Sequence, residues 1–513
     1  MKLLLPPGVS RTRFDKALAG FAAVVGREWV LAGDDDRETY LDQYAPGLDA
    51  SHAASAAVAP ASVEQVQAVL KVANQHGIPV WPISRGKNFG YGGAAPRMAG
   101  TVMLDLGRMN RIIEVNEKLG YCIVEPGVGF FDLWEHLKTN KIPLQVGIPG
   151  NGWGSVVGNA LERGFSGAGD HSNNICGLEM VLPTGELVRT GMGAMADSKA
   201  WPLFKHGFGP SWDQMIVQGN FAVVTKLCLW MKPADEAAIS IEVKLPQPTD
   251  LQWYVEAMAP LRLQGVVDGL VRLTSYQASA TVPTLRSQWY QGNDSIPEPV
   301  IQQIMQRMNV GWWNGPLRLS GFSDVCEANL KRVLDRLARY TRQEFPVTRL
   351  PGNAQSGPST YPLQMVNWYG GRGGHIGYSP VMPADPKLVQ EQFERTRRRY
   401  QQFGLDYSGT FYIDGRSATN VNLILYSKDD EEQKQRVRQL FEALIKDAHE
   451  QGYGEYRTHL SYMDDVAATY DFNHNALLKL NERVKDLLDP NGILAPGRNG
   501  IWPRAWRNQR GVL

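Results

Sequence analysis

The sequence predicts a large α+β protein with two differently organised parts. Its 513 residues exceed the usual size of one domain and leave enough apolar material for two cores. Up to about residue 230, short apolar strands alternate with turns and amphipathic helices, which is typical of α/β units. Beyond about residue 240, the order of strand and helix patterns predicts an antiparallel sheet covered by helices.

The first part begins with amphipathic helices, predicted over residues 12–28 and 63–76, the second with Ser62 as its N-cap. The turn-rich residues 232–235 mark the end of this part. Strands are predicted within it at 78–84, 102–106, 121–125 and 225–230.

The second part contains longer helices between short strands. A last helix over 476–488 stops at Asp489-Pro490-Asn491-Gly492, a strong end signal. The other predicted helices cover 253–263, 300–308, 329–340, 387–403 and 431–451, and the strands 240–243, 410–413 and 421–426.

The composition excludes several classes of protein. A net charge of +1 argues against nucleic-acid binding, and 43% hydrophobic residues argue against disorder. No stretch approaches the ~20 apolar residues that span a bilayer. The start at Met1–Gly8 is too short for a signal peptide, and the four scattered cysteines resemble reduced core thiols. We therefore expect a soluble cytoplasmic protein.

Two glycine-rich segments could hold a ligand. Residues 84–93 can point backbone N–H groups at a pyrophosphate and fit neither the P-loop nor the Rossmann pattern, and residues 149–159 allow close approach of a flat ligand. The alternative is that they are structural turns or tight backbone packing. Two such segments in one half favour a large phosphate-bearing cofactor.

Other motifs leave their chemistry open. The histidines lack metal-ligand spacing, and 164–168 misses the G-x-S-x-G pattern, so a metal enzyme and a serine hydrolase are disfavoured. Tyr456-Arg457 could stabilise an oxyanion such as a phenolate, or form a buried hydrogen-bonded pair. His375 lies among glycines and fits a catalytic or a structural role.

Several collinear motifs nevertheless point to one family. They are NFGYGGAAP within 82–96, residues 121–127, GSVVGNALERG (154–164), GELVRTGMG (185–193), GHIGYSP (374–380), residues 452–459 and residues 488–502. In these motifs, over nearly the whole chain, the sequence resembles the vanillyl-alcohol oxidase group of FAD-dependent enzymes. That group includes eugenol oxidase and the flavoprotein subunit of 4-cresol dehydrogenase.

The resemblance implies a two-domain FAD-binding fold, with two α/β FAD subdomains and an antiparallel-sheet cap domain. We expect an FAD-binding domain at 1–238, a cap domain at 239–452 and a C-terminal segment at 453–513 that completes the site. The resemblance also implies a homodimer, and an electron acceptor that is oxygen, a cytochrome or a copper protein. It implies no metal.

The resemblance assigns residues to the cofactor. His375 would attach FAD covalently through the 8α-methyl group, which would raise the flavin potential. The loop with Ser84, Arg85, Gly86, Lys87, Asn88 and Phe89 would cradle the pyrophosphate. The remaining expected cofactor contacts are Pro149, Gly154, Ser155, Gly158, Asn159, Glu162, Gly164, Val224 and Arg498.

The resemblance also implies a reaction on phenols. Tyr91, Tyr456 and Arg457 match the family's phenolate-binding trio. Two hydroxyl donors and a permanent cation favour the ionised phenol, which weakens the benzylic C–H bond. Hydride would pass to flavin N5 and leave a p-quinone methide, which water, a second proton loss or an internal nucleophile can resolve.

The chain departs from the family where a catalytic base is expected. Gly150 replaces the Asp of vanillyl-alcohol and eugenol oxidases, and Thr410 replaces the Glu of the 4-cresol enzymes. The segment 165–171 lacks the two tyrosines of the family pattern. These smaller residues predict a wider pocket for a bulky lignin-derived phenol or lignan.

Asp414 follows Thr410 and Tyr412 at alternate positions, so it would share their strand face and could replace the base. The alternative for Asp414 is a surface residue at the strand end. For the whole protein, the alternatives are an oxidase of small 4-alkylphenols and a flavin-binding protein with impaired catalysis. A glycolate or sugar oxidase on this fold is disfavoured by the phenolate trio.

Overall fold

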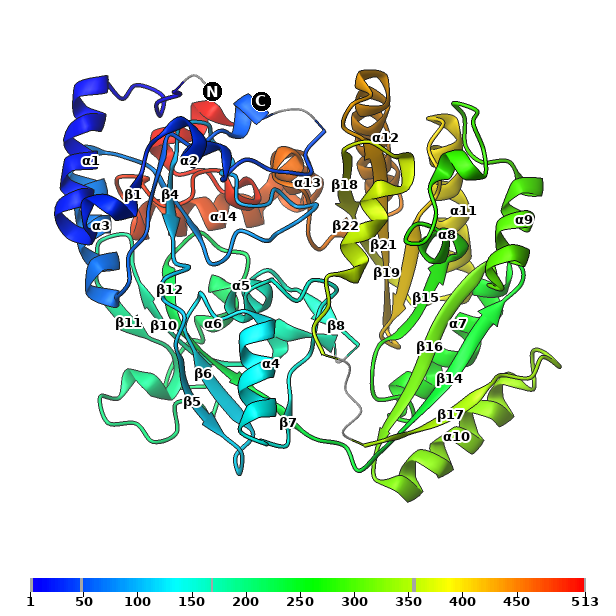
Figure 1. The fold of residues 1–513 in the computed structure, drawn as a ribbon. Helices are drawn as coiled ribbons and strands as arrows, with labels where there is room; N and C mark the ends of the chain where they lie inside the picture. Colours follow the sequence, from blue (N-terminus) through cyan, green and yellow to red (C-terminus); the bar gives the residue numbers. More distant parts are fainter. Residues whose placement is uncertain (1–2, 47–48, 168, 353–356, 512–513) are drawn as a thin grey trace. The chain divides into compact units, whose positions relative to one another are not determined.

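The computed structural model describes residues 3–46, 49–167, 169–352 and 357–511. They form two compact units, shown in Figure 1. Unit 1 comprises residues 1–165, 170–233 and 459–513, and unit 2 comprises 166–169 and 234–458. The units divide at 233/234 and 458/459, so Tyr456 and Arg457 fall within unit 2.

The first sheet of unit 1 has the order β1-β2-β4-β3, with β2, β4 and β3 parallel. Its strands are β1 (Val30–Leu31), β2 (Ala56–Val58), β4 (Val102–Asp105) and β3 (Val80–Ile83). Helices α1 (Arg11–Val25) and α3 (Val63–His76) pack together beside it and share its core. Ser62 caps α3 by accepting the Gln65 N–H at 3.3 Å.

The second sheet of unit 1 is antiparallel throughout, with the order β11-β10-β12-β6-β5. Its strands are β11 (Leu187–Arg189), β10 (Ile175–Val181), β12 (Val223–Trp230), β6 (Tyr121–Val124) and β5 (Ile112–Asn116). Helices α4 (Phe130–Thr139) and α5 (Val156–Leu161) contribute to its apolar core. The short strands β7 (Leu144–Gln145) and β13 (Lys232–Pro233) pair with each other.

The C-terminal segment completes unit 1. It contains α13 (Met463–Thr469) and α14 (Phe472–Leu488). Val80 of β3 donates its N–H to Ile493 at 2.7 Å and accepts the Ala495 N–H at 2.8 Å. The segment therefore supplies a further backbone partner to β3, the strand from which the first glycine-rich loop departs.

Unit 2 is built on one antiparallel sheet with the order β17-β14-β16-β15-β20-β21-β19-β22, and β18 also pairs with β21. The strands are β14 (Ala237–Leu245), β15 (Val271–Ser275), β16 (Trp313–Gly321), β17 (Val347–Pro351), β18 (Gly373–Tyr378), β19 (Pro380–Pro383), β20 (Gly409–Ile413), β21 (Ser417–Ser427) and β22 (Gly454–Glu455). Helices α7 (Asp250–Leu263), α10 (Ser323–Leu337), α11 (Pro386–Gln402) and α12 (Glu431–Glu450) form a contiguous layer against it. The helix-covered antiparallel sheet predicted for this half is present.

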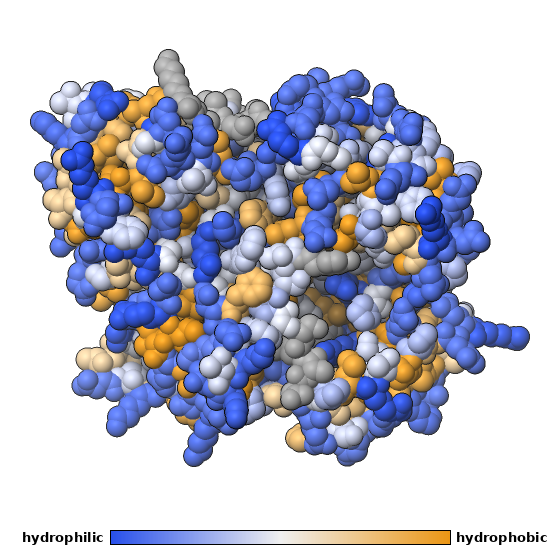
Figure 2. Space-filling view, viewed as in Figure 1, coloured by the Kyte–Doolittle hydropathy of each residue, from blue (hydrophilic) through white to orange (hydrophobic). Residues whose placement is uncertain are grey.

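The remaining elements are short helices, short strands and 3-10 turns that lie between the elements described above. They are α2 (Asp34–Glu38), β8 (Phe165–Ser166), β9 (Gly169–Asp170), α6 (Asp213–Ile216), α8 (Tyr276–Ala280), α9 (Glu298–Met308), and 3-10 turns at Arg27–Trp29, Asp49–His52, His171–Asn174, Gly191–Ala194, Arg286–Gln288, Tyr361–Tyr369, Leu460–Tyr462, Arg498–Gly500 and Arg504–Gln509. Within the described residues, every helix is too short or too polar to cross a membrane. Hydrophobic residues on the face shown in Figure 2 gather in separate small patches.

Candidate functional site

The loop that follows β3 is shaped by glycines. Gly86, Gly90 and Gly92 have φ angles of 62°, 80° and 115°, in the region that side-chain-bearing residues rarely adopt. The N–H groups of Tyr91 and Gly93 both donate to the Asn88 carbonyl, at 3.1 and 3.0 Å. The result is a tight turn whose backbone can approach a ligand closely.

Neighbouring segments of unit 1 hold this loop. A Cβ on Gly86 would lie 2.8 Å from the Cβ of Ala94, and a Cβ on Gly92 would collide with Leu460. Arg85 donates to the Gly127 carbonyl at 3.0 Å and pairs with Asp132 at 2.7 Å. Its guanidinium therefore anchors the loop to the start of α4.

The second glycine-rich segment lies against the first. A Cβ on Gly158 would stand 2.5 Å from Ser84 Oγ, so α5 can approach the loop only because this position is glycine. Ser155 accepts the Gly158 N–H at 3.0 Å and donates to the Pro126 carbonyl at 2.6 Å. The side chain of Asn151 donates to the Lys87 carbonyl at 3.2 Å. Two segments far apart in the sequence thus form one cradle.

A half-buried arginine lies at the end of α5. Arg498 pairs with Glu162, and its guanidinium lies 5.5 Å from the Trp81 ring. Burial lowers the pKa of Arg498 to about 10. Asn159 is hydrogen-bonded to His171 Nδ1 at 2.6 Å, and burial lowers the pKa of His171 to about 4, so His171 is neutral at physiological pH.

The remaining predicted cofactor residues of unit 1 are spread around this cradle. Val224 is buried in β12, and Gly164 must lack a side chain because a Cβ would collide with Asn159. The ring of Phe89 packs 4.9 Å from the ring of Tyr44, and Gly154 accepts the Phe130 N–H at 3.1 Å. Pro149 is half-buried and Lys87 is exposed.

These residues fit a large phosphate-bearing cofactor. Two backbones meet where added Cβ atoms would fill the space, and a glycine-rich backbone of this kind can approach a phosphate closely without side-chain charge. The loop from Ser84 to Phe89, together with Ser155 and Gly158, would hold the diphosphate. Among the residues that the structure describes, no cluster of His, Cys, Asp and Glu could hold a metal ion.

The sheet of unit 2 carries His375 on the face that lies away from its helices. The even-numbered residues of β21 are buried towards the helices, since Tyr378, opposite Asn422, donates its hydroxyl to Leu444 of α12 at 2.8 Å. Residues paired across strands share a face. Three positions stand opposite odd-numbered residues of β21: His375 opposite Leu425, Thr410 opposite Val421, and Tyr412 opposite Thr419. They therefore lie on the face of the sheet away from the helices, which we call the site face.

Glycines bring the His375 strand close to its neighbours. A Cβ on Gly373 would collide with the Val366 carbonyl, and one on Gly374 would lie 2.8 Å from the Tyr426 ring. His375 itself is 8% exposed. On the same face, Thr410 donates its hydroxyl to Thr274 at 3.1 Å, so no carboxylate stands at the Thr410 position.

Tyr456 and Arg457 follow directly after β22, at the end of this sheet. The Tyr456 N–H donates to the Ser379 carbonyl at 3.4 Å, and both side chains are half-buried. Glu455 precedes them and accepts the Ser379 N–H at 2.7 Å. The structure therefore places Tyr456, Arg457 and His375 in unit 2, and Tyr91 in unit 1.

Asp414 lies in the turn after β20. That strand ends at Ile413, Gly415 has a φ of 81°, and the alternation expected from Thr410 and Tyr412 does not continue. Asp414 pairs with Arg262 of α7 at 2.9 Å, with its side chain 53% exposed. Since α7 belongs to the helix layer, this geometry favours the surface alternative over a base on the site face.

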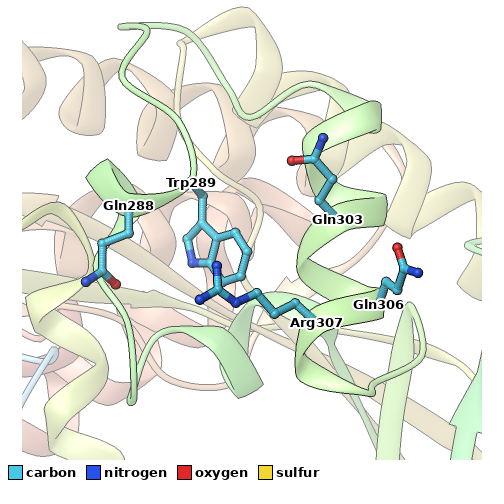
Figure 3. A pocket seen from close by; sticks show the side chains of 5 residues that line it. All are labelled: Gln288, Trp289, Gln303, Gln306 and Arg307. Atoms are coloured by element: carbon cyan, nitrogen blue, oxygen red, sulfur yellow. The ribbon is translucent and has the colours of Figure 1, made fainter.

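A separate cavity of about 340 Å³ lies elsewhere in unit 2. Figure 3 shows its lining residues, Gln288, Trp289, Gln303, Gln306 and Arg307, which come from the segment before α9 and from α9 itself. The Arg307 guanidinium lies 5.4 Å from the Trp289 ring. None of the predicted site residues lines this cavity.

Comparisons with known proteins agree with a flavin site. A family described as "FAD binding domain" matches residues 54–191, and "FAD linked oxidases, C-terminal domain" matches 358–499. The 4-cresol dehydrogenase [hydroxylating] flavoprotein subunit of Pseudomonas putida is 34% identical over 97% of this chain and 98% of its own length.

Two solved structures share the whole fold. A 4-ethylphenol oxidase from Gulosibacter chungangensis, in complex with isoeugenol, superposes with a TM-score of 0.94 and 31% identity over 98% of this chain and 100% of its own. The structure of p-cresol methylhydroxylase with substrate bound superposes with a TM-score of 0.92 and is 33% identical, over 97% of this chain and 99% of its own.

The fold and the cradle define an FAD-dependent oxidoreductase with a two-domain fold. The chain belongs to the vanillyl-alcohol oxidase and 4-cresol dehydrogenase family. The resemblance and the fold class expected from the sequence are thereby confirmed.

Sequence reasoning missed two buried groups. Glu455 lies within the motif at 452–459, but no pattern in the neighbouring sequence indicates that it contacts Ser379. The buried pair of Asp42 and His459 joins residues at opposite ends of the chain. Only an alignment of related sequences, showing both positions varying together, would have linked them.

Proposed function

We propose that this protein oxidises the benzylic carbon of para-substituted phenols with FAD as its oxidant. The observation that carries the proposal is the Tyr456-Arg457 pair at the end of the sheet whose site face presents His375. The names of similar proteins support it, since they refer to 4-cresol, 4-ethylphenol and p-cresol.

The phenolate would be held by Tyr456, Arg457 and Tyr91. Tyr91 is included with Tyr456 and Arg457 because its neighbour Gly92 packs against Leu460, which closely follows Arg457 in the sequence. Only Thr458 and His459 stand between Arg457 and Leu460 in the sequence. Two hydroxyl donors and a guanidinium would lower the pKa of a bound phenol by stabilising its anion.

The chain's residues would prepare the substrate for oxidation by holding it as the phenolate. Ionisation sends electron density into the ring and weakens the benzylic C–H bond. FAD, when bound, supplies the acceptor for the hydride. The substrate is left as a p-quinone methide; water adds its oxygen to the benzylic carbon and releases a proton to solvent, while the ring regains the phenolate.

The pocket would take a bulky lignin-derived phenol or a lignan. The resemblance implies acids at positions 410 and 150; here Thr410 leaves the sheet of unit 2 without a charge at that point, and Gly150 in unit 1 has no side chain. Without a carboxylate base, solvent water or a hydroxyl of the substrate itself would trap the quinone methide. Small 4-alkylphenols remain the second candidate, favoured by the names of the two solved structures.

Further features of the holoenzyme belong to the same proposal. His375 would carry FAD covalently, because it stands on the site face of β18. The electron acceptor would be oxygen or a cytochrome or copper protein, and the relative named as a flavoprotein subunit supports a protein partner. A homodimer in the cytoplasm is the expected assembly.

Anaerobic reduction of the purified holoenzyme tests the proposal. A 4-alkylphenol should bleach the flavin absorbance, and a pinoresinol-type lignan should do so faster than vanillyl alcohol. If no para-substituted phenol bleaches the flavin, the protein is a flavin-binding protein without this catalysis. Faster bleaching by 4-ethylphenol than by any lignan would instead select the second candidate.

A further inference from the structure

Glu455 is a buried carboxyl group with a defined backbone partner. It lies in β22, opposite Pro380 of β19, and its side chain is 6% exposed. Its Oε1 accepts the Ser379 N–H at 2.7 Å, while the Ser379 carbonyl accepts the Tyr456 N–H at 3.4 Å. Residues 455 and 456 thus bind both backbone polar groups of Ser379.

The length of β22 explains why a side chain is needed there. The strand has only two residues, Gly454 and Glu455, so its backbone cannot bond all of the neighbouring strand. The Glu455 carboxyl replaces the missing backbone acceptor, which avoids burying an unsatisfied N–H. Since Ser379 follows β18 directly, one short backbone path joins Glu455 to His375.

The surroundings favour an uncharged carboxyl. Burial raises the pKa of Glu455 to about 8, and the hydrogen bond from the Ser379 backbone offsets the rise only in part. The helices packed nearby contribute Asp447, which is paired with Arg399 at 2.7 Å, and Arg395, which donates to Gln392 at 3.0 Å. Tyr378 of β18 donates its hydroxyl to Leu444, so these neighbouring polar groups are bonded elsewhere.

We propose that Glu455 is a positioning residue for phenolate binding: by holding Ser379, its carboxyl group fixes the backbone from which Tyr456 and Arg457 project. This inference rests on the proposed function. A neutral carboxyl performs the role without placing an anion beside the site that must stabilise one. At alkaline pH the Glu455 carboxyl group ionises, and an anion then lies beside the site that must bind the phenolate.

Three variants separate positioning from simple stability. Glu455→Gln keeps the size and the acceptor and cannot ionise, whereas Glu455→Ala removes the acceptor. Asp447→Asn is the matched control, because it changes another buried acid of unit 2 that bonds a side chain and not Ser379. Flavin content and thermal unfolding of each holoenzyme check folding.

The readout is binding of 4-nitrophenol, whose ionised form is coloured, followed by difference absorbance between pH 6 and 10. We expect Glu455→Ala to weaken binding at least tenfold and to raise the pKa of the bound nitrophenol, with Glu455→Gln and Asp447→Asn within threefold of wild type at pH 7. Above pH 8, wild type should lose affinity while Glu455→Gln retains it. Steady-state kinetics should show the Ala defect mainly in KM.

Each outcome decides the matter. Wild-type affinity in Glu455→Ala, or an equal alkaline loss in wild type and Glu455→Gln, overturns the role of Glu455. If Glu455→Ala does not fold, the alkaline comparison with Glu455→Gln still decides. If wild type neither binds 4-nitrophenol as its anion nor is reduced by any phenol, the proposed function itself fails, and the inference falls with it.

Discussion

His459 Nε2 lies 2.7 Å from Asp42 Oδ2, and this contact joins two fully buried side chains that are 417 residues apart in the chain. The Ser461 N–H donates to His459 Nδ1 at 3.2 Å, so the imidazole proton is on Nε2 and points at the carboxylate. Asp42 also accepts the Tyr44 N–H at 2.9 Å and lies beside Gly93 of the cofactor loop. The pair therefore ties the loop to the segment that follows Arg457.

Replacing Asp42 with Asn should destabilise unit 1 by about 3 kcal/mol, because a buried charged acceptor is lost and His459 keeps a weaker partner. Thermal unfolding of the holoenzyme measures the change. The exposed pair of Arg11 and Asp15 offers a control, since Asp15→Asn should cost less than about 1 kcal/mol. Equal effects of the two substitutions would contradict a structural role for the buried pair.

Gly92→Ala should lower FAD content and thermal stability together. The new methyl group would collide with Leu460 at a φ of 115°, which forces the loop to move. Gly209→Ala is the control, because its φ is 94° and nothing lies within 4 Å of the added atom. Flavin absorbance per protein gives the result, and normal FAD content in Gly92→Ala would argue against the loop as a cofactor element.

Asp414→Asn should leave turnover within about twofold and stability within about 1 kcal/mol of wild type, because an exposed ion pair contributes little. Steady-state rates with the best phenol measure the effect. A fall of more than tenfold, with unchanged flavin content, would restore Asp414 as the base.

Glu455 should make stability depend on pH in a defined direction. Its pKa is about 8 in the folded protein and near 4.5 when unfolded, so raising the pH through this window favours the unfolded chain. The advantage of Glu455→Gln over wild type should be absent below pH 4.5, grow to about 3 kcal/mol at pH 7 and level off above pH 8. Unfolding temperatures across this range test it, and a constant difference would refute the raised pKa.

Acid precipitation of the purified protein should give a yellow pellet, and His375→Ala should give a colourless one. Heat and acid release only FAD that is not covalently bound, so the colour reports the bond directly. Gly373 and Gly374 remain in the variant, so the strand keeps its close packing. A yellow pellet from His375→Ala would move the attachment to another residue.

The sequence was most informative where periodicity and local signals agree. The helix predicted at 431–451 is α12 (Glu431–Glu450), and the strands at 410–413 and 421–426 lie within β20 and β21. Alternation failed at Asp414 because a glycine turn ends the strand, which changes where the next side chain points. The ion pair between Arg85 and Asp132 joins residues that no local pattern connects, so the sequence alone did not indicate it. The contacts of Asp42 and Glu455 depend on tertiary packing and leave no local trace.

The bonds between Val80 and residues 493–495 impose an order on biosynthesis. Until the ribosome has released those late residues, one edge of β3 lacks its partner, and the loop beyond it departs from an incomplete sheet. Co-translational folding can therefore assemble the early helices but cannot finish the cradle. FAD loading must therefore wait until residues 493–495 have been made and have joined β3, so a ribosome stalled before those codons leaves an apoprotein.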